Sequence, residues 1–355
     1  MSQRENVNPR REQDHRKNSR RYQKRAAARR RRNTIFIMEI VLLLILAVVL
    51  FFVSKLSKIE KTKLDMDKIE VNEDISQESR KIMKGYQTIA MFGLDNRSNG
   101  NLSQGRSDVI MLANINNDTK EVKLVSVYRD TYLDTGDGIF QKCNAAYAKG
   151  GPEQAISMLN VNLDLNITDY VTVDFNSIIE CVDLLGGVDM EITDDEASLM
   201  TGYIRELNEL TGNKAENLTQ GGTYTLNGVQ ACAYARIRYG GGDDYRRTER
   251  QRTVLTAMVK KAQQSDLTTV NKLINEVCGD IQTSFSNAEL LALASQVFQY
   301  SIGDTTGFPF TKTTRVLSKK TGDVVIPCDL SDNVKELHIF LYEDSAYTAS
   351  DTVKQ

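Results

Sequence analysis

Six of the twelve arginines that follow residue 53 fall within the 17 residues from 236 to 252, in the run RIRYGGGDDYRRTERQR. Arginine is permanently charged, and its planar side chain can donate two parallel hydrogen bonds to one phosphate group. The chain after residue 53 is otherwise acidic, so this run is a local concentration of cations and not part of a basic surface. The sequence therefore predicts a site for a phosphate or pyrophosphate group.

The run divides into two groups of candidate ligands. Arg236 and Arg238 flank Ile237, so on a short strand both charges would share one face while Ile237 points into the core. After three glycines, Arg247 and Gln251 share one face of the first turns of a predicted helix. A helix N-terminus adds N–H donors and partial positive charge, which favours a bound anion there.

The other arginines of the run have simpler interpretations. Arg250 is expected on the same helix face, and Arg246 and Arg252 are expected to be solvated neighbours. Each arginine group could also be an ordinary exposed strand face or the solvated side of a helix. Charges at the ends of several separate strands weaken that interpretation, because α/β folds place their sites there.

Carboxylates accompany arginines at these strand ends. Asp95 follows one apolar strand, Arg106 and Asp108 open the next, and Arg129-Asp130 follows a third. Mg²⁺ commonly takes one or two carboxylates together with water and substrate phosphate oxygens, so Asp95 and Asp108 suit that ion. The alternative is that Arg106–Asp108 and Arg129–Asp130 are surface ion pairs.

Histidine limits the possible chemistry. The chain has two, His15 and His338, and no GxSxG motif accompanies them. A histidine-rich metal site is therefore excluded, and any catalysis must rest on carboxylates and arginines, with or without an oxygen-ligated metal. Asp95 or Asp108 is the candidate general base.

The charge distribution predicts a membrane anchor. Residues 1–33 hold 13 of the 45 basic residues and 3 of the 47 acidic ones, whereas residues from 54 onward hold 32 basic and 43 acidic ones. Residues 35–53 form an apolar run with one charge, long enough for a transmembrane helix. The positive-inside rule then places the tail in the cytoplasm and the remainder outside the cell. A cleaved signal peptide is the alternative, but no small-residue cleavage site follows.

The basic tail is expected to contact the lipids of the cytoplasmic membrane, and no nucleic acid is expected as a partner. Residues 54–85 are charged and predict a stalk, with the globular region starting near Tyr86. The five cysteines are widely spaced, without a CxxC pair. One or two disulfides and buried free thiols are both compatible with that spacing.

Strands and helices are mixed along the exported part, which indicates an α/β sandwich. Strands are expected over 86–94, 108–115, 121–128, 170–175, 188–192 and 236–238, and helices over 152–159, 177–185, 196–210, 227–234, 247–262 and 286–298. Residues 219–225 are expected to be a loop.

Seven segments resemble, in order, the motifs of the LytR-CpsA-Psr family of membrane-anchored cell-wall enzymes. They are GLDNRS at 93–98, RSD at 106–108, SVYRDTYL at 126–133, KCNAAYAKGG at 142–151, FNSIIECVDLLGGVDMEI at 175–192, LNGVQACAYARIRYG at 226–240 and DYRRTERQR at 244–252. Two positions depart from the pattern. Cys143 replaces an aliphatic residue, and Arg246 replaces a glycine, which leaves open which of Arg246 and Arg247 faces the phosphate.

The resemblance implies an α/β/α sandwich with a central mixed sheet and a hydrophobic pocket for a polyprenyl tail. It implies a catalytic domain at 86–305, followed by a C-terminal extension at 306–355 without an assigned role. The implied enzyme is an extracellular phosphotransferase that moves a glycopolymer from undecaprenyl pyrophosphate to a peptidoglycan hydroxyl. A lipid-pyrophosphate hydrolase and a non-catalytic lipid-pyrophosphate binder are the alternatives.

The resemblance also implies roles for individual residues. Asp95, Asp108 and Arg129 would be catalytic, and Asp95 and Asp108 would hold Mg²⁺. The pyrophosphate would be bound by Arg106, Arg129, Arg236, Arg238, Arg247 and Gln251. Asp130 would orient arginines.

Overall fold

The computed structural model describes residues 60–61, 64–94, 102, 105–238, 244–266, 269, 272–273 and 281–354. The predicted cytoplasmic tail at 1–33, the predicted transmembrane helix at 35–53 and Asp95 lie outside these residues. Within the described part of the chain, no helix combines the length and the apolar composition that crossing a membrane requires.

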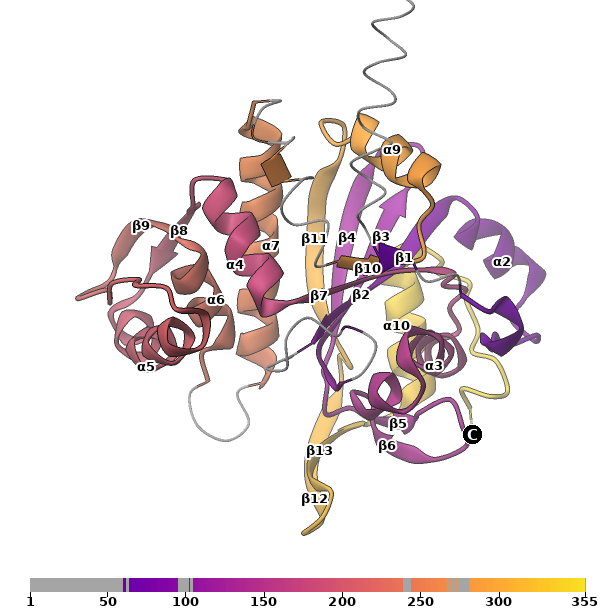
Figure 1. Ribbon diagram of the computed structural model, residues 1–355. Coiled ribbons are helices and arrows are strands. Elements are labelled where there is room, and N and C mark those ends of the chain that lie inside the picture. Colours follow the sequence, from indigo (N-terminus) through magenta and orange to yellow (C-terminus); the bar gives the residue numbers. More distant parts are fainter. Residues whose placement is uncertain are drawn as a thin grey trace, which may run out of the picture. The chain divides into compact units, whose positions relative to one another are not determined.

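A mixed sheet of seven described strands forms the centre of the domain, in the order β1–β10–β7–β2–β3–β4–β11 (Figure 1). The strands are β1 (Glu60–Lys61), β2 (Tyr86–Leu94), β3 (Ser107–Asn116), β4 (Glu121–Val127), β7 (Asp169–Asp174), β10 (Ile281–Thr283) and β11 (Ser301–Phe308). The pairs β1–β10, β7–β2 and β4–β11 are parallel, and the other neighbours are antiparallel.

Helices cover both faces of this sheet. On one face, α3 (Ala145–Leu163) and α10 (Leu330–Tyr342) share a core with the strands, as Phe92, Ile156 and Leu337 illustrate. On the other face lie α4 (Phe175–Leu184), α7 (Asp244–Gln264) and α9 (Asn287–Ser295). The expected α/β/α sandwich with a mixed sheet is therefore confirmed.

The side-chain alternation of β2 explains how one strand serves both cores. Ala90, Phe92 and Leu94 belong to the core under α3 and α10, whereas Ile89 belongs to the core on the opposite face and Met91 packs against it. Successive side chains of a strand point to opposite faces, so a strand buried on both sides is apolar at nearly every position.

A smaller layer packs beyond α4 and α7. It consists of α5 (Asp194–Thr211), α6 (Gly228–Arg236) and a hairpin of β8 (Val188–Ile192) with β9 (Gly222–Leu226), around a core of its own. Capping boxes formed by Thr193 with Glu196 and by Asn227 with Gln230 begin the two helices. The expected loop at 219–225 was wrong in its second half, because Gly222–Leu226 pairs with β8.

The remaining elements are short. They are the 3-10 helix η1 (Met66–Lys68), α2 (Gln77–Met83), β5 (Tyr132–Asp134), β6 (Phe140–Lys142), β12 (Lys312–Ser318) and β13 (Gly322–Pro327).

The core extends beyond both boundaries expected for the domain, residues 86 and 305. Ile69 and Met83, from the predicted stalk at 54–85, are buried in the core under α3 and α10. The predicted extension at 306–355 supplies α10 to that core. The buried Asp164 carboxylate joins the two segments, because it accepts hydrogen bonds from the side chain of Asn72 (2.5 Å) and the backbone N–H of Ser350 (2.8 Å).

Candidate pyrophosphate-binding site

Four strand ends meet at one edge of the central sheet. Strands β2 and β7 are parallel, and their carboxyl ends lie side by side, with Leu94 paired to Asp174. Strand β3 is antiparallel to β2 and β4, which brings its start at Ser107 and the end of β4 at Val127 to the same edge. Charged residues that precede or follow these strands therefore converge, as expected from the sequence.

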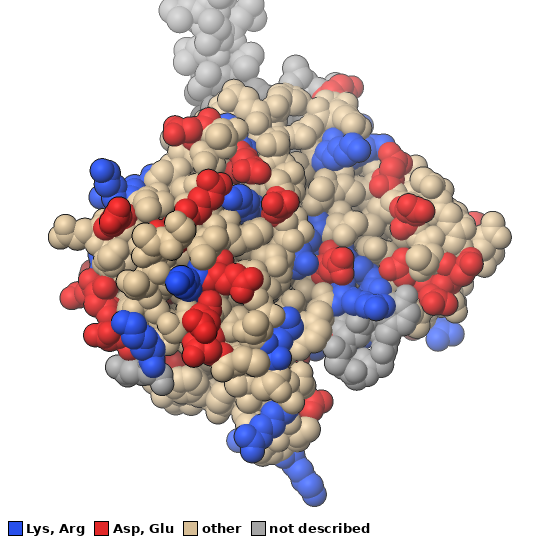
Figure 2. Space-filling model, turned by 180° about the vertical axis from the view of Figure 1, so that it is seen from behind, with Lys and Arg blue, Asp and Glu red and all other residues tan. Residues whose placement is uncertain are grey.

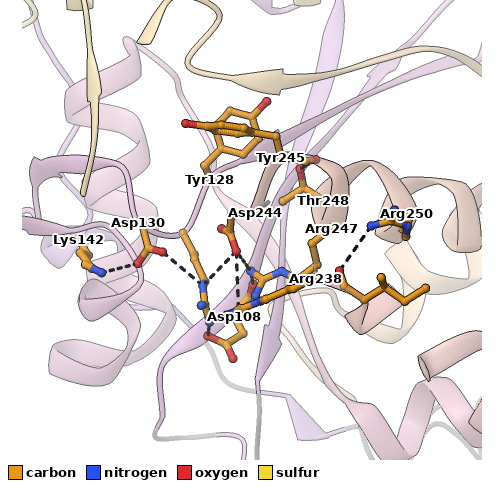
Figure 3. A network of polar contacts seen from close by, with 12 residues as sticks. Asp108, Tyr128, Asp130, Lys142, Arg238, Asp244, Tyr245, Arg247, Thr248 and Arg250 are labelled. Atoms are coloured by element: carbon orange, nitrogen blue, oxygen red, sulfur yellow. Dashed lines mark hydrogen bonds and ion pairs between the residues drawn. The ribbon is translucent and has the colours of Figure 1, made fainter. Parts of the chain in front are cut away.

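The Arg129 guanidinium links three carboxylates at this edge. Its Nη1 donates a 2.7 Å hydrogen bond to Asp108 Oδ1, and its Nε lies 3.6 Å from Asp244 Oδ1 and 3.7 Å from Asp130 Oδ2. Asp130 in turn lies 2.9 Å from Nζ of Lys142 (Figure 3). Only 18% of the Arg129 side chain is exposed, so it belongs to a partly buried network and not to a surface ion pair.

Asp244 contacts three arginines, one at the end of β4 and two from the arginine-rich run at 236–252. Its Oδ1 lies 3.0 Å from Nη2 of Arg247, 3.6 Å from Nη2 of Arg238 and 3.6 Å from Nε of Arg129. Asp244 is the first residue of α7, where a carboxylate also interacts favourably with the helix end. The carboxylate thus offsets repulsion among cations that lie close together (Figure 3).

Several polar atoms around this cluster lack a hydrogen-bond partner within the described residues. They are Arg129 Nε, Arg247 Nε, Gln251 Oε1 and Asp244 Oδ2, and all are buried. Buried polar groups are normally satisfied, so a concentration of unsatisfied atoms indicates a place for a polar ligand or water.

Burial and the carboxylates act in opposite directions on the two central arginines. Burial lowers the pKa of Arg247 to about 10, although Asp244 opposes this, so the side chain remains a cation at neutral pH. Burial also lowers the pKa of Arg129, but Asp108 and Asp244 outweigh it and raise that pKa above its ordinary value. Both guanidinium groups therefore keep the charge that binding a pyrophosphate requires.

A cavity of about 300 Å³ opens onto these side chains. Its lining contains Asp108, Arg129, Phe175, Tyr203, Arg236, Arg238, Arg247 and Gln251. Five of the six residues expected to bind pyrophosphate, all except Arg106, are therefore brought together, with Asp108 beside them. We call this space the arginine cavity.

A second, apolar cavity of about 110 Å³ lies between the sheet and helices α4, α6 and α7. Met91, Val109 and Val171 line it from the sheet, and Leu255 and Met258 line it from α7. Phe175 and Gln251 line both this cavity and the arginine cavity, so the two adjoin. The amphipathic pattern of α7 predicted an apolar face, but could not distinguish core from cavity wall.

The strand predicted through Arg236 and Arg238 was wrong. Arg236 is the last residue of α6, and Ile237 ends the helix with φ −53° and ψ 135°. Ile237 is fully buried, as expected, and both arginines still reach the arginine cavity. Arg236 lies 3.1 Å from the Glu206 carboxylate and over the ring of Phe175, at 5.3 Å from its centre.

The structure resolves which of two neighbouring arginines faces the cavity. Helix α7 begins at Asp244, three residues earlier than expected. Arg247 is 4% exposed and lines the arginine cavity, whereas Arg246 is exposed. The motif arginine is therefore Arg247.

Two further arginines of α7 are buried outside the cavity lining. Arg250 donates a 3.0 Å hydrogen bond to Glu196 at the start of α5. Arg252 was expected to be solvated, but it is 8% exposed, because its side of α7 packs towards β11, with Nε 3.4 Å from Thr305 Oγ1. These residues join layers of the fold.

Two expected site residues lie elsewhere or outside the described part. Arg106 is exposed just before β3 and does not line the arginine cavity. Asp95 falls in the segment that follows β2 and is not described. The expected roles of both residues stay predictions.

Three residues of the site were not expected from the sequence. Asp244 stands three residues before Arg247, and this i, i+3 spacing was the one available signal for it. Phe175 and Tyr203 carry no local signal, since each is an ordinary aromatic position until the fold brings it beside Arg236.

No disulfide joins the described cysteines. These are Cys143, Cys181, Cys232 and Cys328, whereas Cys278 lies outside the described residues. Cys143 is fully buried, and burial raises its pKa far above the ordinary value, so the thiol stays protonated. Its position supports a packing role for this departure from the family pattern.

Known proteins share sequence similarity with this chain. A polyisoprenyl-teichoic acid–peptidoglycan teichoic acid transferase, TagU of Enterococcus faecalis, is 30% identical over 210 residues, which cover 58% of this chain and 64% of the relative. TagV of Bacillus subtilis, a transferase with the same descriptive name, is 30% identical over 195 residues, covering 54% of this chain and 48% of the relative. The chain thus matches about half to two thirds of the length of these relatives.

Solved structures show the same fold. The protein YwtF (TagT), described as a LytR-CPS2A-psr family protein with bound octaprenyl pyrophosphate lipid, superposes with a TM-score of 0.54 and 22% identity. The superposition covers 73% of this chain and 92% of that one. The model of the LytR_cpsA_psr family matches residues 46–315. The chain therefore belongs to the LytR-CpsA-Psr family.

Proposed function

We propose that this chain is a membrane-anchored phosphotransferase that moves a glycopolymer from an undecaprenyl-pyrophosphate carrier to a hydroxyl of peptidoglycan outside the cell. One observation carries the proposal: a cavity lined by arginines adjoins an apolar cavity, with Phe175 and Gln251 in both linings. A lipid pyrophosphate has the same division into a charged head and an apolar tail.

The names of related proteins support the same reaction class. The relatives in Enterococcus faecalis and Bacillus subtilis are named for transfer of teichoic acid to peptidoglycan, and the related YwtF structure holds octaprenyl pyrophosphate. We propose the same class of donor and the same class of acceptor for this chain, and we assign no particular polymer.

In the proposed reaction, an acceptor hydroxyl oxygen attacks the phosphorus nearer the glycan. The bond from that phosphorus to the bridging oxygen breaks, and polyprenyl phosphate leaves. The hydroxyl proton passes to a carboxylate, for which Asp108 and Asp95 are the candidates. Arg129, Arg238 and Arg247 would neutralise charge on the phosphate oxygens as it develops, which is the main protein contribution in phosphoryl transfer.

The oxygen ligands available near the arginine cavity suit a magnesium ion that binds together with the substrate. Asp108 lines the arginine cavity, and one of its carboxylate oxygens accepts a hydrogen bond from Arg129. Among the described residues, no cluster of three or more His, Cys, Asp or Glu could hold a metal without further ligands. Mg²⁺ characteristically completes its shell with water and phosphate oxygens, so one or two carboxylates suffice. We propose Asp108 and Asp95 as ligands; when bound, the ion would neutralise pyrophosphate charge.

The proposed setting follows from the sequence. Residues 35–53 would span the membrane, the basic tail at 1–33 would lie in the cytoplasm against membrane lipids, and the catalytic domain would face the cell wall. No nucleic acid is proposed as a partner.

Hydrolysis of the same lipid is the second candidate, because the Arg238 side chain is 40% exposed and water reaches the cavity. The test uses the full-length protein in detergent with lipid-linked donor, with and without peptidoglycan. Phosphate-linked glycan on the acceptor is the expected product. Release of glycan phosphate at the same rate without acceptor would support hydrolysis, and tight donor binding without turnover would support a non-catalytic binder.

A further inference from the structure

A two-stranded hairpin carries a surplus of positive charge in this acidic domain. Strands β12 and β13 and the turn between them contain Lys312, Arg315, Lys319 and Lys320 against one acid, Asp323. Figure 1 shows the hairpin projecting below the sheet, and Figure 2 shows basic side chains on the protrusion at the same end. We call this element the basic hairpin.

The charges of the basic hairpin are available for binding. Every residue from 313 to 320 is exposed. Among the described residues, no carboxylate forms an ion pair with Arg315, Lys319 or Lys320. The turn is ordered by hydrogen bonds from the Thr321 backbone N–H to Ser318 Oγ and between their hydroxyl groups, each 3.0 Å. The two lysines therefore extend from a fixed turn into solvent.

The base of the hairpin is attached to the reaction site. The backbone N–H of Val325 donates a 2.9 Å hydrogen bond to the carbonyl oxygen of Asp130, and Val325 forms a β-bridge with Thr131. These two residues directly follow Arg129, which lines the arginine cavity. A polymer that leaves the cavity at this attachment would first meet Arg315, whose strand partner Val324 precedes Val325, and then the turn with Lys319 and Lys320.

A second attachment joins the hairpin to helix α7. The ammonium group of Lys312 lies over the rings of Tyr128 and Tyr245, 4.9 and 4.6 Å from their centres, and these rings pack edge to face. Tyr245 follows Asp244, the carboxylate that gathers the arginines. Lys312 is therefore a structural contact, whereas the three outer cations are not used by the fold.

We infer that the basic hairpin binds the polyanionic part of the donor, a polymer with a negative charge on each repeat, as it extends from the pyrophosphate. This inference rests on the proposed function. An acidic domain repels a polyanion. Screening by salt limits the range of each charge to about 8 Å at physiological ionic strength, so cations that bind the polymer must lie close to its path. A strand of seven residues is about 23 Å long, which is enough to contact several repeats.

A membrane surface is the competing partner, because Val316 and Leu317 are 64% and 38% exposed. Binding to a lipid interface scales with the apolar area that is buried, and two neighbouring side chains offer little. The attachment of the hairpin beside the arginine cavity favours the polymer.

The test compares matched charge reversals in the full-length protein in detergent. The test variant is Arg315→Glu with Lys319→Glu and Lys320→Glu. The control combines Lys81→Glu, Lys214→Glu and Lys335→Glu, which changes the net charge equally at exposed positions outside the hairpin. The probe is fluorescent poly(glycerol phosphate) without lipid, measured by anisotropy at low and physiological salt.

The hairpin variant should bind the polymer at least about tenfold more weakly at low salt and lose most of the salt dependence, whereas the control should change less than about twofold. Equal losses in both variants, or no polymer binding by the natural protein, would overturn the inference. The inference would also be overturned if the hairpin variant lost binding to anionic phosphatidylglycerol vesicles but kept its polymer binding.

Turnover of a donor with one neutral sugar separates the two proposals. The hairpin variant should keep the kcat of the natural protein with this donor, because its cations do not touch the pyrophosphate. A reduced kcat would contradict the assigned role. Absence of turnover in the natural protein, with polymer binding intact, would count against the proposed function and leave the hairpin assignment standing.

Discussion

Arg129 Nη1 donates a 2.7 Å hydrogen bond to Asp108 Oδ1, which joins the end of β4 to the start of β3. The same guanidinium lies 3.6 Å from Asp244, the carboxylate that also contacts Arg238 and Arg247. Carboxylates thus hold the arginines together. A bound pyrophosphate would bring negative charge to a cluster that is already positioned, which reduces the cost of ordering it.

Replacing Arg247 with Ala should lower kcat/KM for lipid-linked donor by about 100-fold or more, because it removes a buried charged donor from the cavity. Arg246→Ala is the matched control, and should stay within about twofold because Arg246 is exposed and does not line the cavity. Steady-state kinetics measure the effect, and thermal unfolding checks that both variants fold. Similar losses in both variants would show that the arginine assignment is wrong.

Asp244→Asn should lower kcat without raising KM. The amide cannot balance three arginines, so their positions should loosen and kcat should fall by about tenfold or more. Removing a negative charge beside the phosphates should not raise KM. A raised KM with unchanged kcat would contradict the positioning role.

Magnesium dependence provides a separate prediction. Chelation of divalent cations should abolish transfer, and added Mg²⁺ should restore it. Asp108→Asn should shift the Mg²⁺ concentration for half-maximal activity upward by about tenfold or more, because a neutral amide is a weaker ligand for a hard cation. Full activity of the natural protein in excess chelator would exclude the proposed metal.

The apolar cavity should select for the lipid tail. Ala235 lines it, so Ala235→Phe should fill part of the space and raise KM for a long-chain polyprenyl donor more than for a short-chain one. Ala288→Phe, at an exposed position of α9, is the size-matched control. An equal KM change for both chain lengths would indicate that the tail binds elsewhere.

His338 should make the fold sensitive to acid. The ring is buried, stacks on Tyr347 at 3.8 Å, and lies 3.1 Å from the carbonyl oxygen of Leu163. Burial lowers the pKa of His338 below its ordinary 6.5. Between these two pKa values the unfolded chain binds more protons than the folded one, so stability falls as the pH drops below about 6.5, by at most about 1.4 kcal/mol per pH unit.

Urea unfolding at pH 7.5 and pH 5.5 measures this effect. His338→Gln removes the titrating group, and should therefore lose less stability between the two pH values than the natural protein. Equal losses would mean that other groups cause the acid sensitivity.

The sequence predicted the central strands well, because their signal is local. Strands β2, β3 and β4 are rich in apolar residues and ended by charged or turn residues, and their bounds agree with expectation to within one residue. The positions of Arg129 and Asp108 followed from these strands, since strand ends meet at a sheet edge once the pairing is known.

Features that depend on distant partners could not be predicted. Arg236 is the last residue of a helix, and its side chain contacts Glu206 and Phe175. No local sequence pattern distinguishes this helix end from a strand. The role of the C-terminal segment could not be predicted either, because Ser350 donates a hydrogen bond to Asp164, which lies 186 residues earlier in the chain. The role of Asp244 could not be predicted either, because it depends on Arg129, which comes from a distant part of the chain.

The central claim is transfer of a glycan phosphate, and phosphorus labelling tests it most directly. Two batches of lipid-linked donor would carry the radioactive label either on the phosphorus nearer the glycan or on the one nearer the lipid. With the full-length protein, Mg²⁺ and peptidoglycan, the first label should appear in the peptidoglycan and the second should remain with the polyprenyl phosphate. Absence of the first label from peptidoglycan, with either label released to water instead, would contradict the account.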